Sequence, residues 1–126
     1  SRWHSYGMLG NYYFCNKDSS YIVWYKKYVS EVDRLWQDRN GMLERNSAYY
    51  DAAVAAYRIA DYKSAAKYFY MAKENMLEIS GCGYLYFAMS LMKEKKYQKA
   101  VEYFTKYQNQ TGKDVSAQIN ECNKYL

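Results

Sequence analysis

Apolar residues recur at intervals of three and four positions along most of this chain, which is the spacing of one face of an α-helix. In the segment from residue 48 to residue 72 this spacing occurs twice, with a break near Ala60 and Asp61. The two stripes are Tyr49, Ala52, Ala53 and Ala56 before the break, and Ala65, Phe69 and Ala72 after it. The pattern predicts two helices joined by a tight turn, with alanines and aromatic rings on the faces that pack together.

The same pattern returns 35 residues later. The segment "DYKSAAKYFYMAKE" at 61–74 aligns with "KYQKAVEYFTKYQN" at 96–109, and the segments before them, "AYYDAAVAAYRI" and "GYLYFAMSLMKE", align as well. A fixed period of this length is typical of helical repeat proteins. Because two short helices cannot bury such faces alone, we expect neighbouring helix pairs to stack.

The last residues, 114–126, have the features of a helix that closes such a stack. A stack needs an end with a polar outer face. This segment places its apolar residues on one stripe, which consists of Val115, Ile119, Cys122 and Leu126. Gly112 is expected to end the preceding helix, and Asp114 is a suitable N-cap. The sequence therefore predicts a C-terminal capping helix.

These residues resemble the tetratricopeptide repeat (TPR) family, whose signature has a large aromatic, Leu-Gly and Tyr in the first helix and Ala and Phe in the second. The opening segment "YGMLGNYYF" matches the first-helix half, and Gly10, Ala53 and Ala88 occupy equivalent positions for small residues. The resemblance implies an all-α fold, a right-handed α-solenoid of three helix pairs plus the capping helix, with seven helices in a single domain over residues 1–126. The expected units are about 3–37, 46–79 and 81–110, followed by the cap at 114–126.

The sequence also departs from the family pattern, most of all in the first unit. The family's proline at the end of the second helix is absent throughout, and the bulky side chains of Tyr25 and Tyr107 stand where small residues are usual. The second helix of the first unit is expected at 21–36, followed by an insertion at 37–47 around Gly41. We therefore expect regular second and third units and a less regular first unit.

Composition favours a helical fold and disfavours some other classes. Among the 126 residues there is no proline and there are only six glycines, which argues against turn-rich β folds. No apolar run approaches the roughly 20 residues that span a bilayer, so we expect a soluble protein, with the cytoplasm slightly favoured. The opening "SRWHSYGM" lacks an initiator methionine and a signal-peptide core, which we interpret as a piece of a larger protein.

The sequence offers little for catalysis or metal binding. His4 is the only histidine, and no pattern pairs it with a nucleophile or a carboxylate. Cys15, Cys82 and Cys122 are far apart and lack the C-x-x-C spacing of zinc sites, so we expect small buried apolar side chains. Gly-rich phosphate loops are also absent. We expect no enzymatic activity, small-molecule substrate, cofactor or metal.

The TPR resemblance places a set of mostly aromatic and methionine side chains on the inner surface of the stack, which the first helix of each pair would line. The expected peptide-binding residues are Asn11, Tyr50, Tyr57, Arg58, Tyr86 and Met89. Tyrosine provides rigid contact area and methionine adapts its shape, which suits a protein or peptide segment with apolar anchors. The resemblance therefore implies an adaptor or scaffold, with Tyr57 and Arg58 as the preferred hot-spot pair.

Some members of the family grip the C-terminal carboxylate of chaperones with Lys, Asn and Arg side chains in the groove. In this chain only Asn11 matches that set, whereas Asp51, Cys82 and Tyr86 stand at the other positions. A carboxylate that faces Asp51 and Tyr86 would lose its charge-assisted hydrogen bonds. We therefore expect no binding that depends on a free peptide C terminus.

Other interpretations stay open. Aromatic and methionine stripes at helical spacing also occur in ordinary cores, so the chain can instead be a structural segment of a larger assembly, or a self-associating repeat, without a groove ligand. The stretch "KEKKYQK" at 93–99 suits either a solvated turn or a contact with RNA or another anionic surface. Its expected place between paired helices and the modest net charge of +5 favour the solvated turn over nucleic-acid binding.

Overall fold

The computed structural model describes residues 20–35, 42–79 and 81–126. Its helices are α2 (Tyr21–Leu35), α3 (Met42–Arg58), α4 (Tyr62–Ala72), α5 (Glu74–Ile79), α6 (Gly83–Lys93), α7 (Tyr97–Thr111) and α8 (Ser116–Asn123). This described part of the chain contains helices and no strand, which confirms the all-α class. The expected first helix of the first unit, with Gly10 and Asn11, lies outside the described residues, as do His4 and Cys15.

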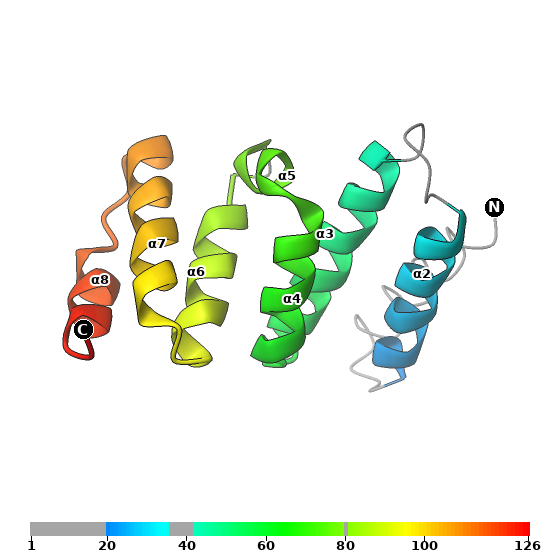
Figure 1. The fold of residues 1–126 in the computed structure, drawn as a ribbon, viewed down its shortest axis with the longest axis horizontal. Helices are drawn as coiled ribbons and strands as arrows, with labels where there is room; N and C mark the ends of the chain where they lie inside the picture. Colours follow the sequence, from blue (N-terminus) through cyan, green and yellow to red (C-terminus); the bar gives the residue numbers. More distant parts are fainter. Residues whose placement is uncertain (1–19, 36–41, 80) are drawn as a thin grey trace.

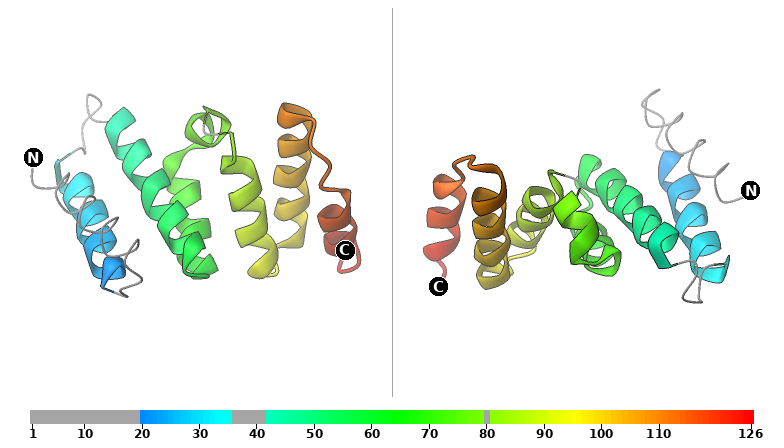
Figure 2. Two further views of the ribbon diagram at one scale, coloured as in Figure 1. Left: turned by 180° about the vertical axis from the view of Figure 1, so that it is seen from behind. Right: turned by 90° about the horizontal axis from the view of Figure 1, so that it is seen from above.

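The helices lie in one row, with α2 at one end and α8 at the other (Figure 1). Along this row α3 packs on α4 and α6 packs on α7, while α4 also packs on α6 and so joins the two pairs. In Figure 1 α4 lies in front of α3, and the view from behind reverses this order (Figure 2). The pair formed by α3 and α4 therefore presents one helix to each side of the row.

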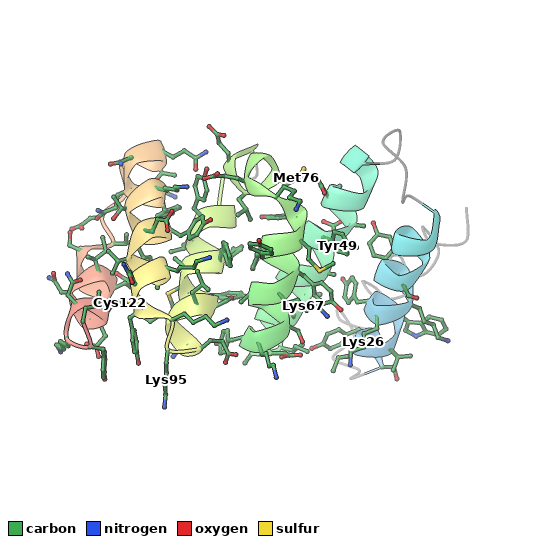
Figure 3. All side chains as sticks on the ribbon, in the orientation of Figure 1. Lys26, Tyr49, Lys67, Met76, Lys95 and Cys122 are labelled. Atoms are coloured by element: carbon green, nitrogen blue, oxygen red, sulfur yellow. The ribbon has the colours of Figure 1, made fainter. Side chains whose placement is uncertain are left out.

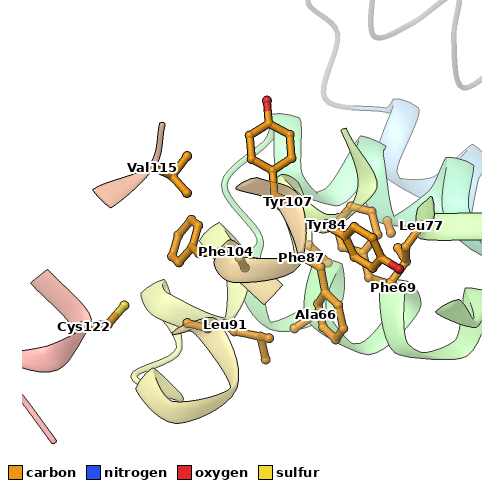
Figure 4. Packing of buried hydrophobic residues seen from close by; sticks show 14 of the residues in the cluster. Ala66, Phe69, Leu77, Tyr84, Phe87, Leu91, Phe104, Tyr107, Val115 and Cys122 are labelled. Atoms are coloured by element: carbon orange, nitrogen blue, oxygen red, sulfur yellow. The ribbon is translucent and has the colours of Figure 1, made fainter. Parts of the chain in front are cut away.

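A continuous hydrophobic core joins the helices from α3 to α8. Phe69 and Phe104 are fully buried in it, and the ring centroid of Phe69 lies 5.9 Å from that of Phe87. Figure 4 shows these rings together with neighbouring aliphatic side chains of the core. Burial of a complete Phe or Leu side chain contributes about 1.5 to 3 kcal/mol, so this core is the main stabilising feature of the row.

Alanines occupy fully buried positions between the helices. Ala53 and Ala88, which are equivalent in the repeat, have no exposed surface, and the same holds for the equivalent pair Ala65 and Ala100. Protein interiors are packed as densely as organic crystals, so a larger side chain at these positions would push the helices apart. The repeat seen in the sequence is therefore also a repeat of burial.

The turn between α3 and α4 is a Schellman motif. The Asp61 N–H donates to the Ala56 carbonyl at 2.9 Å. The Ala60 N–H donates to the Tyr57 carbonyl at 3.0 Å. Ala60 itself has a φ of 63°, in the left-handed region that glycine usually occupies. The Asp61 carboxylate then caps α4 by accepting the Ser64 N–H at 3.2 Å, and the predicted break at this place is confirmed.

The turn between α6 and α7 has the same geometry at the equivalent residues. The Lys96 N–H donates to the Leu91 carbonyl at 2.9 Å. The Lys95 N–H donates to the Met92 carbonyl at 3.0 Å, and the φ of Lys95 is 62°. The period of 35 residues is thus a period of backbone geometry as well as of side chains.

The start of α3 differs from the sequence prediction. The sequence predicts an insertion at 37–47, yet residues 42–47 belong to α3. No glycine or proline follows Gly41 in this segment, and residues 43–45, Leu-Glu-Arg, are good helix formers. Local propensity therefore extends the helix toward its N terminus, so that the second half of the expected insertion is the start of α3.

The second half of the expected unit at 46–79 is divided into α4 and α5 instead of forming one helix. The chain changes direction at Lys73, which has a φ of 72° and a ψ of 158°. This change buries the side chain of Leu77, which is only 2% exposed, in the core. Lys106 of α7 also forms an ion pair with Glu74 at the start of α5. No helix-breaking residue marks this place, so packing decides the break.

Helix α8 forms where the sequence predicts a C-terminal helix and packs on α7 at one end of the row, but its apolar stripe differs in one residue. Val115 and Cys122 are buried, and Ile119 packs against the same core. Leu126 is 69% exposed because α8 ends at Asn123. The expected place of Leu126 on the apolar stripe is therefore wrong.

The connection between α7 and α8 follows the sequence prediction in part. Gly112 ends α7 with a φ of 73°, as predicted. Val115, and not Asp114, is the residue at the N-cap of α8. The Asp114 carboxylate nevertheless accepts the Ser116 N–H at 2.9 Å, and hydrogen bonding to Ser116 lowers the pKa of Asp114.

Tyrosines dominate the contact of α2 with its neighbour α3. Tyr21, Tyr25 and Tyr28 are all buried, and the rings of Tyr21 and Tyr25 meet edge to face at 6.2 Å. A cavity of about 30 Å³ remains beside them, between α2 and the pair formed by α3 and α4. A gap of this size holds about one water molecule.

Candidate functional site

Two of the expected binding residues meet on neighbouring helix pairs. Tyr57 is in the last turn of α3 and Tyr86 is in the first turn of α6. Their rings stack with centroids 4.7 Å apart and planes at 29°. The ring of Tyr62 lies edge-on to Tyr57 at 5.8 Å. Both stacked tyrosines are half-buried, so each ring has one part in the protein and another part in contact with solvent.

Tyr50 and Met89 have different surroundings. The Tyr50 ring meets the fully buried Phe69 ring edge-on at 5.8 Å and packs against the core, so Tyr50 serves packing as well as any surface. Met89 is half-buried and lies one turn after Tyr86 on α6. Met89 therefore follows Tyr86 along α6, and both Tyr50 and Met89 pack, like the stacked tyrosines, against the main core as partly buried side chains.

The two polar members of the expected site are less well defined. Arg58 is exposed and is the last residue of α3, directly after Tyr57. Its cationic side chain at the C-terminal end of a helix interacts favourably with the helix dipole. Asn11 lies outside the described residues. The structure therefore brings together Tyr57 and Tyr86, with Arg58 and Met89 as their neighbours along the two helices.

Tyr57 remains neutral well above neutral pH because its pKa is raised. Burial, followed by the neighbouring hydroxyls of Tyr62 and Tyr86, raises the pKa of Tyr57. In a separate cluster, where α2 packs on α3, burial raises the pKa of Tyr28 to about 12, with smaller contributions from Asp51 and Tyr25. A neutral phenol can donate a hydrogen bond from its hydroxyl and present an apolar ring. The surface therefore offers rings and hydroxyl donors, with Arg58 as a nearby charge.

The described residues contain no group of three or more His, Cys, Asp or Glu side chains that could hold a metal ion. Cys82 and Cys122 are free thiols in this part of the chain. Burial raises the pKa of the Cys122 thiol, which keeps it protonated and unreactive. In the same part of the chain, no helix has the length and apolar character needed to cross a membrane.

Between α4 and the pair formed by α6 and α7 lies a larger concave region that the sequence pattern did not indicate. This cleft has a volume of about 750 Å³. Its charged lining residues are Lys63, Lys67, Lys96, Lys99 and Glu94. Figure 3 shows Lys67 on α4 and Lys95 beside the turn that leads into α7. The stretch "KEKKYQK" was the only local signal, because half of these lysines come from the preceding helix pair.

The TPR resemblance rests on the aromatic, small and alanine positions named above. In this chain the repeated alanines are buried between helices, and the turns that follow them have equivalent hydrogen bonds. These positions therefore have a structural role. Comparison with known proteins adds no relative, since no protein-family model matches the chain and no curated protein shows significant similarity to it.

Proposed function

We propose that the chain is a TPR-like, right-handed α-solenoid that acts as a protein-interaction adaptor. In this proposal a protein or peptide segment binds the surface lined by α3 and α6. The equivalent turns at Ala60 and Lys95 and the equivalent buried alanines support a stack of similar helix pairs. In such a stack the first helices of successive pairs form one extended surface, which suits an extended or helical segment.

The stack of Tyr57 on Tyr86 is the observation that carries this proposal. The two rings come from successive helix pairs and hold each other in place at 4.7 Å. Because they are already ordered, little conformational entropy is lost when a partner packs on their exposed parts. Tyrosine and arginine are enriched among interface hot spots, and both occur here. Met89 adds an apolar contact whose shape can adapt to the partner.

Peptides selected from a phage-displayed random library against the chain provide defined ligands for a test. We expect Tyr86→Ala to weaken the selected peptides by about tenfold or more, as is typical of a hot-spot tyrosine. Isothermal titration calorimetry measures this change. Tyr125→Ala is the matched control because Tyr125 is exposed beyond α8, and it should leave the affinity unchanged. Equal affinity for both variants and the unaltered chain would contradict the adaptor proposal.

The same peptides test the form of recognition. Asp51 and Tyr86 stand where a carboxylate clamp would need cations. Amidation of the peptide C terminus is therefore expected to leave binding unchanged. A large loss on amidation would show that the terminus itself is recognised, through groups other than these.

The second candidate function is a structural segment with no groove ligand, and the position of Tyr50 favours it. The Tyr50 ring packs on Phe69 in the core, so an aromatic at helical spacing in this chain can serve packing alone. Thermal unfolding of Tyr57→Ala and Tyr86→Ala separates the two functions. Lost peptide binding with a Tm changed by only a few degrees supports the adaptor, and loss of the cooperative transition supports the structural segment.

A further inference from the structure

The cleft between α4 and the pair formed by α6 and α7 has an apolar floor. The floor consists of Ala66, Phe87 and Leu91, which are at most 8% exposed (Figure 4). The volume of the whole cleft, about 750 Å³, lies in the usual range of ligand sites. None of the described residues of the proposed peptide-binding surface lines it. The cleft is therefore a separate surface on the α4 side of the row.

Four lysines surround this floor. Lys63 and Lys67 lie one turn apart on α4, and Lys96 and Lys99 lie at the start of α7. Within the described part of the chain, none of these ammonium groups forms an ion pair with a carboxylate. Like charges one helical turn apart repel each other. An anionic partner would relieve this repulsion, whereas a solvated surface gains nothing from gathering the lysines around an apolar floor.

One other lysine of α7 has a different environment. Lys106, on α7, forms ion pairs with Glu74 and with Glu102, and the hydrogen bond to Glu74 raises the pKa of Lys106. The charge of this lysine is therefore compensated within the folded protein. The four cleft lysines have no such partner in the described residues, which separates them from the structural lysine of α7.

An exposed tyrosine stands at the edge of the cleft. Tyr70 is 65% exposed and lines the cleft from α4. The ammonium groups of Lys73 and Lys99 lie 5.9 Å and 5.8 Å from the centre of its ring. Cation–π contacts of this kind hold a ring in place at an exposed site. Tyr70 thus offers a second apolar contact next to the floor, with positive charge on its faces.

We propose that this cleft docks an acidic segment of a partner protein, in which aspartates or glutamates flank an apolar side chain. The apolar side chain packs on Ala66, Phe87 and Leu91, and the flanking carboxylates pair with the lysines on the two walls. Charge complementarity specifies this partner, because the walls carry four lysines and one glutamate around an apolar floor. The surface adds a second docking site to the adaptor, and its residues are independent of Tyr57 and Tyr86.

A nucleic acid fits this cleft less well than an acidic protein segment. A continuous phosphate backbone would pass Glu94, whose carboxylate repels it, whereas a peptide can place its carboxylates only opposite the lysines. Single-stranded nucleic acids also need a series of aromatic rings on which bases stack. Among the residues that the structure describes, Tyr70 is the one exposed tyrosine that lines this cleft.

A short fluorescein-labelled peptide with a central Leu-Phe pair flanked by glutamates tests the proposal by fluorescence anisotropy. We expect it to bind the chain, and to bind more weakly as the salt concentration rises, because salt screens exposed charge pairs. The double variant Lys67→Glu with Lys99→Glu should weaken binding by at least about tenfold, because it places two carboxylates opposite the glutamates of the peptide, and like charges across an interface repel. The variant Lys113→Glu with Lys124→Glu carries the same change of net charge away from the cleft and should bind as the unaltered chain does.

Several results would overturn the proposal. Equal binding by the two double variants would show that only net charge matters, and equal binding by a peptide with glutamines in place of the glutamates would show that charge is irrelevant. Tighter binding of single-stranded RNA with the same dependence on Lys67 and Lys99 would assign the cleft to nucleic acid. A dimer in light scattering that the Lys67 and Lys99 variant dissociates would make a second copy the occupant. Circular dichroism melting of each variant shows that the fold is retained, and Tyr86→Ala, which tests the other surface, should bind this peptide normally.

Discussion

The buried side chains of this protein must fit the space between the helices, and they must be uncharged. Ala53 and Ala88 are fully buried where helix pairs approach each other, and larger side chains would not fit there. Tyr28 is only 8% exposed and lies in a small cluster with Tyr49. A buried phenol resists ionisation because its anion would lose hydration. The chain has 18 tyrosines. Because some of them are buried, we expect the stability of the fold to decrease at alkaline pH.

Tyr28 gives this sensitivity a defined direction. Its pKa rises from 10.0 in the unfolded chain to about 12 in the folded protein. Below pH 10 Tyr28 is protonated in both the folded and the unfolded chain, so pH does not change the free energy of unfolding through this residue. Between pH 10 and about 12 the unfolded chain loses this proton while the folded protein keeps it. The free energy of unfolding therefore falls as the pH rises through this interval. The loss attributable to Tyr28 is about 2 kcal/mol across that interval.

Urea unfolding at a series of pH values from about 9 to about 12 measures this loss in the unaltered chain and in Tyr28→Phe. We expect the free energy of unfolding of Tyr28→Phe to fall less steeply with pH. Tyr70→Phe, at an exposed tyrosine, should keep the slope of the unaltered chain. Identical slopes for Tyr28→Phe and the unaltered chain would mean that Tyr28 ionises freely in the folded protein.

At the scale of the elements, the two Schellman turns show how the helix pairs are made. In both turns a residue other than glycine takes the left-handed position, Ala60 in one and Lys95 in the other. A left-handed conformation costs roughly 1 to 2 kcal/mol for residues with a β-carbon. The turns are nevertheless formed, because their hydrogen bonds satisfy the last carbonyls of α3 and α6. These positions therefore hold strain that the packing of the helix pairs offsets.

Glycine should relieve this strain at either turn. We expect Lys95→Gly, and likewise Ala60→Gly, to raise the free energy of unfolding by about 1 kcal/mol. Lys67→Gly is the matched control for Lys95→Gly, since it places glycine inside α4, where it should lower stability by about 1 kcal/mol. Urea denaturation measures all three variants. A decrease in stability for Lys95→Gly would show that Lys95 does not hold the left-handed conformation in solution.

For the whole molecule, α8 lies at one end of the described row, next to α7. It buries Val115 and Cys122 against the core. Its outer side is polar and its last residues are exposed. A row of stacked helices needs such a polar terminal helix for solubility.

Removal of residues 114–126 should therefore destabilise the molecule as a whole. The truncated chain would expose the core around Phe104, which is fully buried in the complete structure. We expect a loss of about 2 kcal/mol or more, from the apolar area exposed, together with increased binding of an apolar dye. Removal of Leu126 alone is the control, because this residue is 69% exposed. Unchanged melting of the shorter chain would show that α8 does not act as a cap.

The sequence by itself determined those features that depend on neighbouring residues. The spacing of alanines and aromatic rings predicts the helices that carry the core, and the turns near Ala60 and Gly112 are in the expected places. The stripe of tyrosines and methionines likewise indicates which residues of α3 and α6 could share a surface. Periodicity and turn conformation are set within a few residues, so a local pattern records them.

Only the tertiary structure decided the features that join distant residues. The break at Lys73 follows from the burial of Leu77, and the lysine cleft exists because α4 packs beside α6 and the start of α7. The contact of Tyr50 with Phe69 and the stack of Tyr57 on Tyr86 also depend on contacts between separate helices. Such contacts depend on the relative placement of packed elements, which the spacing of residues along one helix does not specify.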